Sequence, residues 1–401
     1  MALIGKRIMV LGAGTFQTPA IRKARELGCH VVTVDYLPDN VGHKYGQQYV
    51  NCSTVDKEGV LQAARETRID GICTFSSDIA VPTVAFVSEQ LGLAGASAAV
   101  AETMATKNRF RAFLRNAGLT CPTFLSSDNF ETIAANLQHL HLPIIFKPVD
   151  TSGSRGITRI DRTDIAACRT AFLKAQGYSR SKTVCVEEFV AGTEVGGDAI
   201  LVNGSVAFIA ITHKHLNGFV VTGHSLPTNI TQPDQARVIE HIEAICHALN
   251  YRSGPLNFDA IVSADHVTML EMSARNGGNG IPAVIERATG VDVEKAAIHL
   301  ALGEIPDLPQ GTQIRQSAGS FVFGSATGGR LERIGSSADL QRQVPNIFEV
   351  HYARQPGDLI EPFEHNGNLI GFALFDCVDA ADYEHVTERI GEALDLAISA
   401  D

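Results

Sequence analysis

The sequence lacks several features that mark particular classes of protein. Of its eight cysteines, no two have the C-x-x-C spacing, and no apolar run reaches the ~18 residues that cross a bilayer. This cysteine pattern argues against a disulfide framework or a zinc site, and it favours buried, reduced thiols in a cytoplasmic protein. The apolar stretch 8–11 is too short for the core of a signal peptide and leads directly into a glycine turn.

An excess of positive charge is also missing. The chain has 33 Lys and Arg against 44 Asp and Glu, a net charge of −11. That balance argues against a nucleic acid or an anionic membrane surface as the main partner. The length of 401 residues and the hydrophobic content of 45% are typical of two or three globular units with substantial cores.

The first part of the chain predicts a β-α-β unit of an open parallel sheet. Strands at 7–11 and 30–34 flank a helix at 19–27, and Gly12-Ala13-Gly14 forms the first turn. A further helix (58–67), strand (71–75) and helix (82–91) continue the pattern. The dinucleotide fingerprint G-x-G-x-x-G has Gln17 in place of its third glycine. One interpretation is a dinucleotide site with Asp35 on a ribose; a tight turn without a nucleotide is the other, and we favour it.

The most informative stretch runs from residue 144 to residue 157. An apolar strand carries Lys147 and is followed by a loop of small residues that includes Gly153 and Gly156. The amides of such a loop and one ammonium group can hold a polyphosphate. A flexible hairpin tip would have the same composition, so the choice depends on what the rest of the chain supplies.

Two carboxylates occupy neighbouring apolar strands further along the chain. Asp259 lies in a strand at 255–262, and Glu271 lies in its hairpin partner at 267–272. An uncompensated charge among apolar residues is costly, which favours a metal or cationic partner over two solvated surface acids. Mg²⁺ takes oxygen ligands and shares them with substrate phosphates.

Between these motifs the sequence predicts a helix at 98–114 and further helices at 133–140, 164–176, 233–249, 282–288, 293–302 and 382–398. It also predicts a long loop with strand-like pieces at 212–229. The basic residues in and just after the helix at 98–114 are Lys107, Arg109, Arg111 and Arg115, and a solvated basic face is one interpretation of them.

Six segments, in this order, resemble the ATP-grasp superfamily of carboxylate–amine ligases. They are Ala105–Phe110, Ile145–Pro148 with Thr151–Ile157, Glu187–Val190, Glu194, Asp259 with Glu271, and Arg275. The resemblance covers nearly the whole chain and implies an α/β protein. It divides the chain into a Rossmann-like domain (1–97), the ATP-grasp small lobe with its phosphate loop (98–182), an α+β large lobe (183–310) and a C-terminal subdomain (311–401).

The resemblance also implies which residues bind the cofactors, ATP and Mg²⁺, with Mn²⁺ as a substitute. The metal ligands would be Asp259, Glu271 and Ser273, and Ser273 departs from the Glu-x-Asn motif that many relatives have. The ATP contacts would be Lys107, Lys147, Ser152, Gly153, Ser154, Gly156, Glu187, Glu188, Phe189, Val190 and Glu194.

The implied reaction activates a carboxylate as an acyl phosphate and joins it to an amine, releasing ADP and phosphate. Arg275, Lys147 and His224 would be the catalytic residues, with His224 as the candidate base for the amine. The substrates would be small molecules such as an amino acid, a dipeptide or a sugar acid, and a homodimer is common in the family. Alternatives are a nicotinamide-dependent oxidoreductase and a non-catalytic ATP-binding protein. Other candidate substrate residues are Ser76, Ser77, Asp78, His213 and Lys214.

Overall fold

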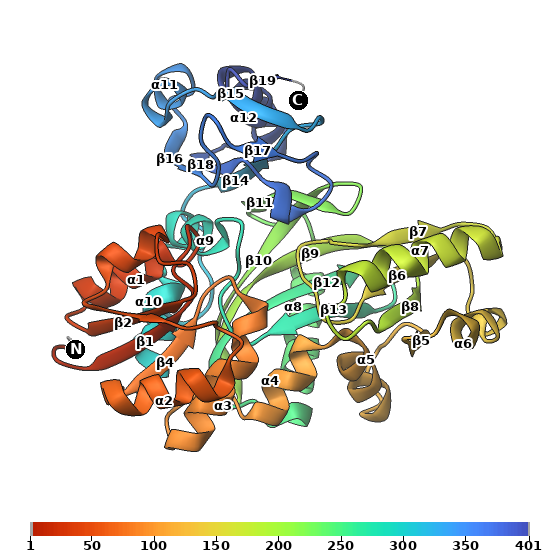
Figure 1. Ribbon diagram of the computed structural model, residues 1–401, viewed down its shortest axis with the longest axis horizontal. Helices are drawn as coiled ribbons and strands as arrows, with labels where there is room; N and C mark the ends of the chain where they lie inside the picture. The colour runs from red at the N-terminus through yellow and green to blue at the C-terminus, as the bar shows by residue number, and fades with distance from the viewer. Residues whose placement is uncertain (1–2, 400–401) are drawn as a thin grey trace.

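The computed structural model describes residues 3–399, and Figure 1 shows three bodies gathered around a central sheet. The N-terminal unit, drawn in red and orange, lies on one side of this sheet, and the yellow small lobe lies on the other. The blue C-terminal part sits above both. The α/β fold class that the sequence predicts is confirmed.

The N-terminal unit is a parallel sheet with the strand order β3-β2-β1-β4. Its strands are β1 (Arg7–Leu11), β2 (His30–Asp35), β3 (Gln48–Asn51) and β4 (Gly71–Thr74). Helix α1 (Thr18–Glu26) connects β1 to β2, α2 (Lys57–Thr67) connects β3 to β4, and α3 (Val81–Leu91) follows β4. The predicted β-α-β pattern is therefore confirmed, and it places the ends of β1 and β4 beside the rest of the protein.

One face of this parallel sheet is covered by a helix from much later in the chain. Helix α10 (Val293–Ala301) contributes Ala297 and Ile298 to the same core cluster as Ile8 and Val10 of β1. The N-terminal unit therefore completes its hydrophobic core with residues about 290 positions after Ile8.

An interruption between two helices positions the first candidate phosphate-binding lysine. The predicted helix at 98–114 is two helices, α4 (Ala98–Ala105) and α5 (Lys107–Asn116), because Thr106 is extended at φ −125° and ψ 109°. Lys107 is thereby the first residue of α5, and its backbone N–H donates to Val149 O at 2.9 Å. The prediction of a solvated basic face is wrong for Arg111, which is 0% exposed.

The small lobe is an antiparallel sheet with the order β5-β8-β6-β7, covered by helices on one face. The predicted helix at 133–140 is instead a short helix and a 3-10 turn (Leu137–His139), because Asn129 caps the chain earlier by accepting from Glu131 N at 2.8 Å. The elements are β5 (Phe124–Ser127), α6 (Phe130–Ala134), β6 (Ile144–Pro148), β7 (Thr158–Ile160), α7 (Ile165–Tyr178) and β8 (Val184–Glu188).

The central sheet has eight strands in the order β13-β12-β9-β10-β11-β14-β18-β16. The segment at 212–229, predicted as a long loop with strand-like pieces, is largely strand, because it pairs as a hairpin that turns at Gly218 and then bonds to β14. The strands and helices of this region are β9 (Thr193–Val202), β10 (Ser205–Asn217), β11 (Val220–Leu226), α8 (Gln232–Leu249), β12 (Gly254–Val262), β13 (Val267–Ser273) and α9 (Ile281–Thr289).

The C-terminal part continues the central sheet and adds a small sheet of its own. The predicted helix at 382–398 begins at Ala380 and ends at Ala393, since Asp379 caps it and the chain then pairs with β15. The elements of the C-terminal part are β14 (Ala318–Phe323), β15 (Gly329–Arg333), α11 (Ser337–Gln343), β16 (Ile347–Tyr352), β17 (Leu359–Ile360), a 3-10 turn (Asn366–Asn368), β18 (Gly371–Asp376), α12 (Ala380–Ala393) and β19 (Ala397–Ser399).

The structure also bears on the state of the cysteines and on membrane-spanning helices. All eight cysteines are free thiols, six of them buried and two half-buried. Within residues 3–399, no helix combines the length and the apolar character that crossing a bilayer requires.

Candidate active site

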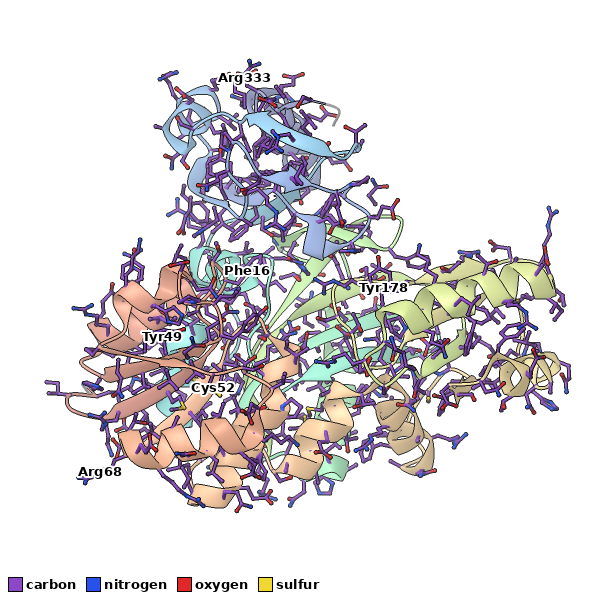
Figure 2. The ribbon with its side chains drawn as sticks, in the orientation of Figure 1. Phe16, Tyr49, Cys52, Arg68, Tyr178 and Arg333 are labelled. Atoms are coloured by element: carbon purple, nitrogen blue, oxygen red, sulfur yellow. The ribbon has the colours of Figure 1, made fainter. Side chains whose placement is uncertain are left out.

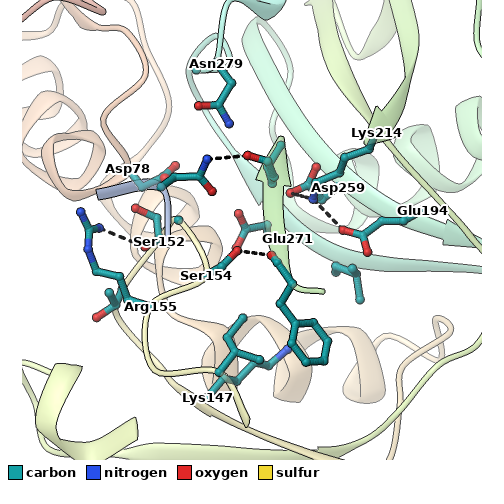
Figure 3. Close-up of a pocket in the computed structure, with 18 of the residues that line it drawn as sticks. Asp78, Lys147, Ser152, Ser154, Arg155, Glu194, Lys214, Asp259, Glu271 and Asn279 are labelled. Carbon is teal, nitrogen blue, oxygen red and sulfur yellow. Dashed lines mark hydrogen bonds and ion pairs between the residues drawn. The ribbon is translucent and has the colours of Figure 1, made fainter. Parts of the chain in front are cut away.

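A cavity of about 310 Å³ lies where the small lobe, the central sheet and the C-terminal part meet (Figure 3). It brings together nearly every residue that the sequence pointed to. Those lining it are Lys107, Lys147, Ser152, Gly153, Ser154, Glu187, Glu188, Phe189, Val190, Glu194, Lys214, His224, Asp259, Glu271 and Arg275.

The loop at 151–156 forms one wall of this cavity, between β6 and β7. Gly153, Ser154 and Gly156 all have φ between +64° and +71°, the left-handed region that glycine adopts most easily. A Cβ on Gly156 would lie 2.9 Å from the ring of Tyr178, so this position requires glycine. Ser154 adopts the same region at a cost of roughly 1–3 kcal/mol, a typical feature of functional loops. Gly156 supports the loop from behind rather than lining the cavity.

Lys147 belongs to a buried cluster of three charges. Its Nζ pairs with Glu187, and Arg111 of α5 donates to the other oxygen of that carboxylate at 2.9 Å. Arg111 also donates to Met269 O at 3.2 Å. Burial alone would raise the pKa of Glu187, but the charges of Arg111 and Lys147 outweigh it and lower this pKa to about 2. The Glu187 side chain therefore fixes two cations, while the lysine faces the cavity.

The two predicted metal carboxylates lie directly opposite each other on β12 and β13. Lys107 Nζ is 3.3 Å from Glu271 Oε2 and donates to Thr151 O at 2.8 Å. Lys214 Nζ lies between Asp259 and Glu194, at 2.9 and 2.6 Å, as Figure 3 shows. Each carboxylate therefore has an ammonium partner, and the site alternates charge along its length.

The pKa values of these two carboxylates differ in direction. Burial raises the pKa of Asp259 to about 6, with the negative charges of Glu271 and Glu194 adding to the rise and Lys214 opposing it. Burial acts the same way on Glu271, but Lys107 and Lys214 hold its pKa below the ordinary value. Neighbouring titratable groups whose pKa values are shifted in opposite directions are typical of functional sites.

The donor set suits a hard cation that shares its ligands with phosphates. Among residues 3–399, no three His, Cys, Asp or Glu side chains converge to form a complete metal site. Two facing carboxylates beside a phosphate-type loop nevertheless match the way Mg²⁺ is held, with one or two carboxylates and the remaining positions taken by substrate oxygens and water. Ser273 lines a smaller neighbouring cavity together with Glu271.

The hinge at Glu187–Val190 presents backbone rather than charge to the cavity. Glu188 N and Phe189 N donate to Thr123 O at 3.0 Å and Pro143 O at 2.8 Å. The Glu188 carboxylate accepts from His141 N at 2.9 Å. Both hinge acids therefore bind protein partners, which leaves the backbone near Val190 as the candidate for reading a flat ligand edge.

Arg275 connects the cavity to the N-terminal unit. Its Nε donates to Asp78 Oδ1 at 2.9 Å, and its Nη1 donates to Asn276 O at 2.9 Å. Burial opposes the charge of Arg275, but Asp78 outweighs this and raises the arginine pKa. Ser76 lines the cavity beside them and donates to Gly277 O at 2.8 Å. Of the other predicted substrate residues, Ser77 precedes the 3-10 turn Asp78–Ala80, and His213 packs against His215 with ring centroids 4.5 Å apart.

His224 has its tautomer fixed by a neighbouring hydroxyl. Thr212 Oγ1 donates to Gly196 O at 3.0 Å, so at 2.9 Å it accepts from His224 Nδ1. The lone pair then lies on Nε2. Burial and the charge of Lys214 hold the pKa of His224 well below its ordinary value, and the ring is neutral at physiological pH. It can accept a hydrogen bond or a proton from a ligand group.

In the glycine turn after β1, the amides of Gly12, Ala13 and Gly14 are all bound within the protein. Gly14 N donates to Gln17 Oε1 at 3.1 Å, and Ala13 N donates to Asp35 Oδ2 at 3.0 Å. The Gln17 amide in turn donates to Phe75 O at 2.6 Å, and Asp35 Oδ1 accepts from Leu37 N at 3.0 Å. Gln17 fills the turn and Asp35 binds backbone, so the favoured interpretation of a turn without a nucleotide agrees with the structure, and the oxidoreductase alternative finds no support.

Comparison with known proteins identifies a domain family for part of the chain. Residues 140–283 match the model of the ATP-grasp domain. This segment is therefore similar to an ATP-grasp domain. It begins just before β6 and runs through the loop at 151–156, the hinge, Asp259 and Glu271 to the start of α9, so the match contains most of the cavity wall described above.

Sequence similarity to curated proteins covers more of the chain than residues 140–283. The chain is 24% identical over 277 residues to alanine–anticapsin ligase of Bacillus subtilis, covering 63% of this chain and 58% of that protein. It is 23% identical over 401 residues to human carnosine synthase 1, covering 90% of this chain and 48% of that one. The chain thus spans about half the length of these curated relatives.

A solved structure gives the fold of the whole chain. The L-amino acid ligase from Bacillus licheniformis superposes with a TM-score of 0.84 at 20% identity, covering 99% of both chains. The described residues, including the N-terminal and C-terminal units, therefore share the fold of this ligase.

Proposed function

We propose that this ATP-grasp protein is an ADP-forming ligase that activates a carboxylate as an acyl phosphate and joins it to an amine. The observation that carries the proposal is the single cavity where the phosphate loop, two lysines and two facing carboxylates meet. Phosphoryl transfer depends mainly on positioning and on neutralising charge, which these groups supply. The named relatives, an L-amino acid ligase and carnosine synthase among them, support the same chemistry.

The nucleotide would lie along the cavity from the hinge to the metal carboxylates. The backbone near Val190 would take the adenine, Glu194 the ribose, and Lys107 and Lys147 the phosphates, under the loop at 151–156. Asp259 and Glu271 would hold Mg²⁺ with Ser273 as the third predicted ligand, and the cation would neutralise phosphate charge; Mn²⁺ is the expected substitute.

The acceptor end of the cavity would bind the substrates. Arg275 would hold a carboxylate or phosphoryl oxygen, and the loop would exclude water from the acyl phosphate. His224 Nε2, an acceptor by virtue of Thr212, would receive a hydrogen bond or proton from the attacking amine. Small substrates such as amino acids or dipeptides fit these groups, and the relatives named above support that class.

Three further features belong to the proposal. The division into units at residues 97, 182 and 310 follows the strand and helix order. A cytoplasmic location suits eight free thiols. A homodimer is the oligomer expected from the family resemblance.

The proposal predicts ADP and phosphate as products when ATP is supplied with Mg²⁺ and a matrix of carboxylic acids and amines. The measurement is coupled ADP release together with mass spectrometry of the amide. Glu271→Gln should reduce turnover about a hundredfold while the protein stays folded in thermal unfolding, because the amide keeps the size of the side chain and loses only its charge toward the metal and Lys107. AMP and pyrophosphate as products would exclude the mechanism, and ATP binding without any turnover across the matrix would favour a non-catalytic ATP-binding protein.

A further inference from the structure

Asn257 lies directly across from the residue where the usual metal motif is broken. In the β12–β13 pair, Asn257 faces Ser273 and Asp259 faces Glu271. Residues two apart on a strand share a face, so all four side chains point to the same side of the sheet. Cross-strand neighbours have their Cβ atoms about 4.5–5.5 Å apart, so an asparagine on either strand can reach the same space.

The orientation of the Asn257 amide is fixed by its hydrogen bonds. Its Nδ2 donates to Gly197 O at 2.9 Å and to Asp198 Oδ1 at 3.0 Å. The reversed amide would bring three acceptor oxygens together, so these partners select one orientation. Both N–H groups are used toward β9, and Oδ1 is left on the side away from it.

The group that holds Asn257 is itself rigid. Asp198 is fully buried and accepts from Gly277 N at 2.8 and 3.0 Å, as well as from Asn276 Nδ2 at 3.3 Å. Such partners behind a ligand fix its direction before a cation arrives. Asn257 lines both the large cavity and the smaller one beside Glu271. Its free oxygen therefore belongs to the wall that carries the two carboxylates.

We infer that Asn257 Oδ1 is the third protein oxygen for the divalent cation that accompanies the nucleotide, in place of the side chain at position 273. The inference rests on the proposed binding of a metal–nucleotide complex by Asp259 and Glu271. An amide oxygen is a good ligand for Mg²⁺. A small residue at 273 leaves room for the asparagine of the facing strand, so the break in the Glu-x-Asn motif and the presence of Asn257 have one explanation.

The test measures metal binding directly, with Mn²⁺ as the probe and ADP present. Free Mn²⁺ is followed by electron paramagnetic resonance while the protein is titrated. Asn257→Ala should weaken Mn²⁺ binding in the ADP complex about tenfold to a hundredfold. Ser273→Ala should change it less than twofold. The matched control is Asn136→Ala, since Asn136 donates to Thr132 O at 2.8 Å on the small lobe, remote from the cavity.

A swap variant separates lost ligation from lost folding. Asn257→Ser combined with Ser273→Asn returns one amide to the site from the other strand, and it should recover most of the affinity that Asn257→Ser alone loses. Weakening by Ser273→Ala but not by Asn257→Ala would overturn the inference, and so would a swap without recovery in a folded protein. ADP binding in the presence of EDTA should be the same in all variants. Absence of ADP binding in the wild type would instead refute the proposed function.

Discussion

Glu187 joins two cations that come from separate motifs, Lys147 on β6 and Arg111 on α5. Of the two cations, Lys147 borders the cavity, and Arg111 is fully buried. A carboxylate with two cations keeps its charge at low cost only while both are present. Lys147 would therefore contact a ligand, and Arg111 would hold the Glu187 carboxylate that positions Lys147.

Replacing Lys147 with alanine should weaken binding of ATP and ADP about tenfold to a hundredfold, since one charge-assisted contact to phosphate is lost. Isothermal titration of ADP measures this. Lys174→Ala is the control, because Lys174 is exposed on α7. Unchanged affinity in the Lys147 variant would remove this lysine from the nucleotide site.

Replacing Arg111 with methionine should lower the free energy of unfolding by about 3–5 kcal/mol at pH 7, because Glu187 loses a buried partner. Arg109→Met is the matched control on the same helix: its partner Glu102 is at the surface and such pairs contribute about 0–1 kcal/mol. Chemical denaturation measures both variants, and equal effects would contradict the role of the cluster.

The same cluster predicts a dependence on acid. The pKa of Glu187 is about 2 in the folded chain, below its ordinary value of 4.5, so the unfolded chain binds the proton first as pH falls. The stabilisation is complete above about pH 4.5 and is lost as pH falls toward 2. The difference between wild type and Arg111→Met should therefore shrink over this interval in denaturation series at graded pH.

Single residues show where inference from sequence succeeds. Lys147, Asp259 and Glu271 stand out because a charge inside an apolar strand needs a partner, and that rule is local. For Arg111, the interpretation as part of a solvated face is wrong. Its buried partners, Glu187 and Met269 O, come from distant parts of the chain, and no local pattern indicates them. Asn257 lies two residues before Asp259 on the same strand, so the sequence already places both side chains on one face. Asparagine is common on strands, and this spacing alone did not mark Asn257 as a site residue.

The phosphate loop is held by contacts from other elements. Ser154 Oγ donates to Phe219 O at 2.6 Å, and Asn366 N donates to Gly153 O at 3.1 Å. Arg155 lies against Gly367, where a Cβ would be 2.2 Å from its Nη2. In Figure 3, Arg155 turns back toward Ser152 of the same loop. The turn at 366–368 therefore belongs to the C-terminal part but serves as a clasp for the loop.

Loosening this clasp should separate ATP hydrolysis from product formation. In Asn366→Ala, the side-chain bond to Val221 O (2.8 Å) is lost and the turn is less well held. We expect several-fold less amide formed per ADP, with faster amide hydrogen exchange at 151–156. Asn346→Ala is the control, as Asn346 donates to Asp376 O elsewhere in the C-terminal part. An unchanged product ratio together with unchanged exchange would contradict the role of the clasp.

Elements were predicted well where their pattern is local and less well where distant partners decide. The strands of the N-terminal unit and the hairpin of β12 and β13 follow their apolar periodicity. The second half of β10 and all of β11 fall in the segment predicted as a long loop with strand-like pieces, because their His and Gly residues become regular strand by pairing with each other and with β14, about 100 residues away. The strand β19 depends in the same way on β15.

At the scale of the whole molecule, aromatic and ionic contacts join the N-terminal unit to the rest. Phe16, labelled in Figure 2, stacks on Phe372 of the C-terminal part with ring centroids 5.2 Å apart. Lys23 of α1 lies 2.6 Å from Glu286, 2.8 Å from Asp292 and 3.2 Å from Glu294. One ammonium group thus faces three carboxylates across the interface.

This interface should make stability fall as pH rises. Burial raises the pKa of Glu294 to about 7, with Lys23 opposing the rise and Asp292 adding to it. The folded chain therefore binds a proton between pH 4.5 and 7 that the unfolded chain has lost, and stability declines over that range by about 3 kcal/mol at most. Glu294→Gln should flatten this decline in thermal unfolding at pH 5 and 8. Glu58→Gln is the control, since Glu58 is exposed on α2 of the same N-terminal unit.

The helix α10 that completes the N-terminal core has a consequence for how the chain is made. About 200 residues separate the first 97 from this helix, which a ribosome adds in roughly 10–40 s. Throughout that interval α1 covers part of one apolar face of the parallel sheet with Ala20, Ile21 and Ala24, and the part of this face that α10 covers stays exposed. That face, around Ile8 and Val10, is the surface on which a nascent-chain chaperone would bind this protein, and α10 would displace it on arrival.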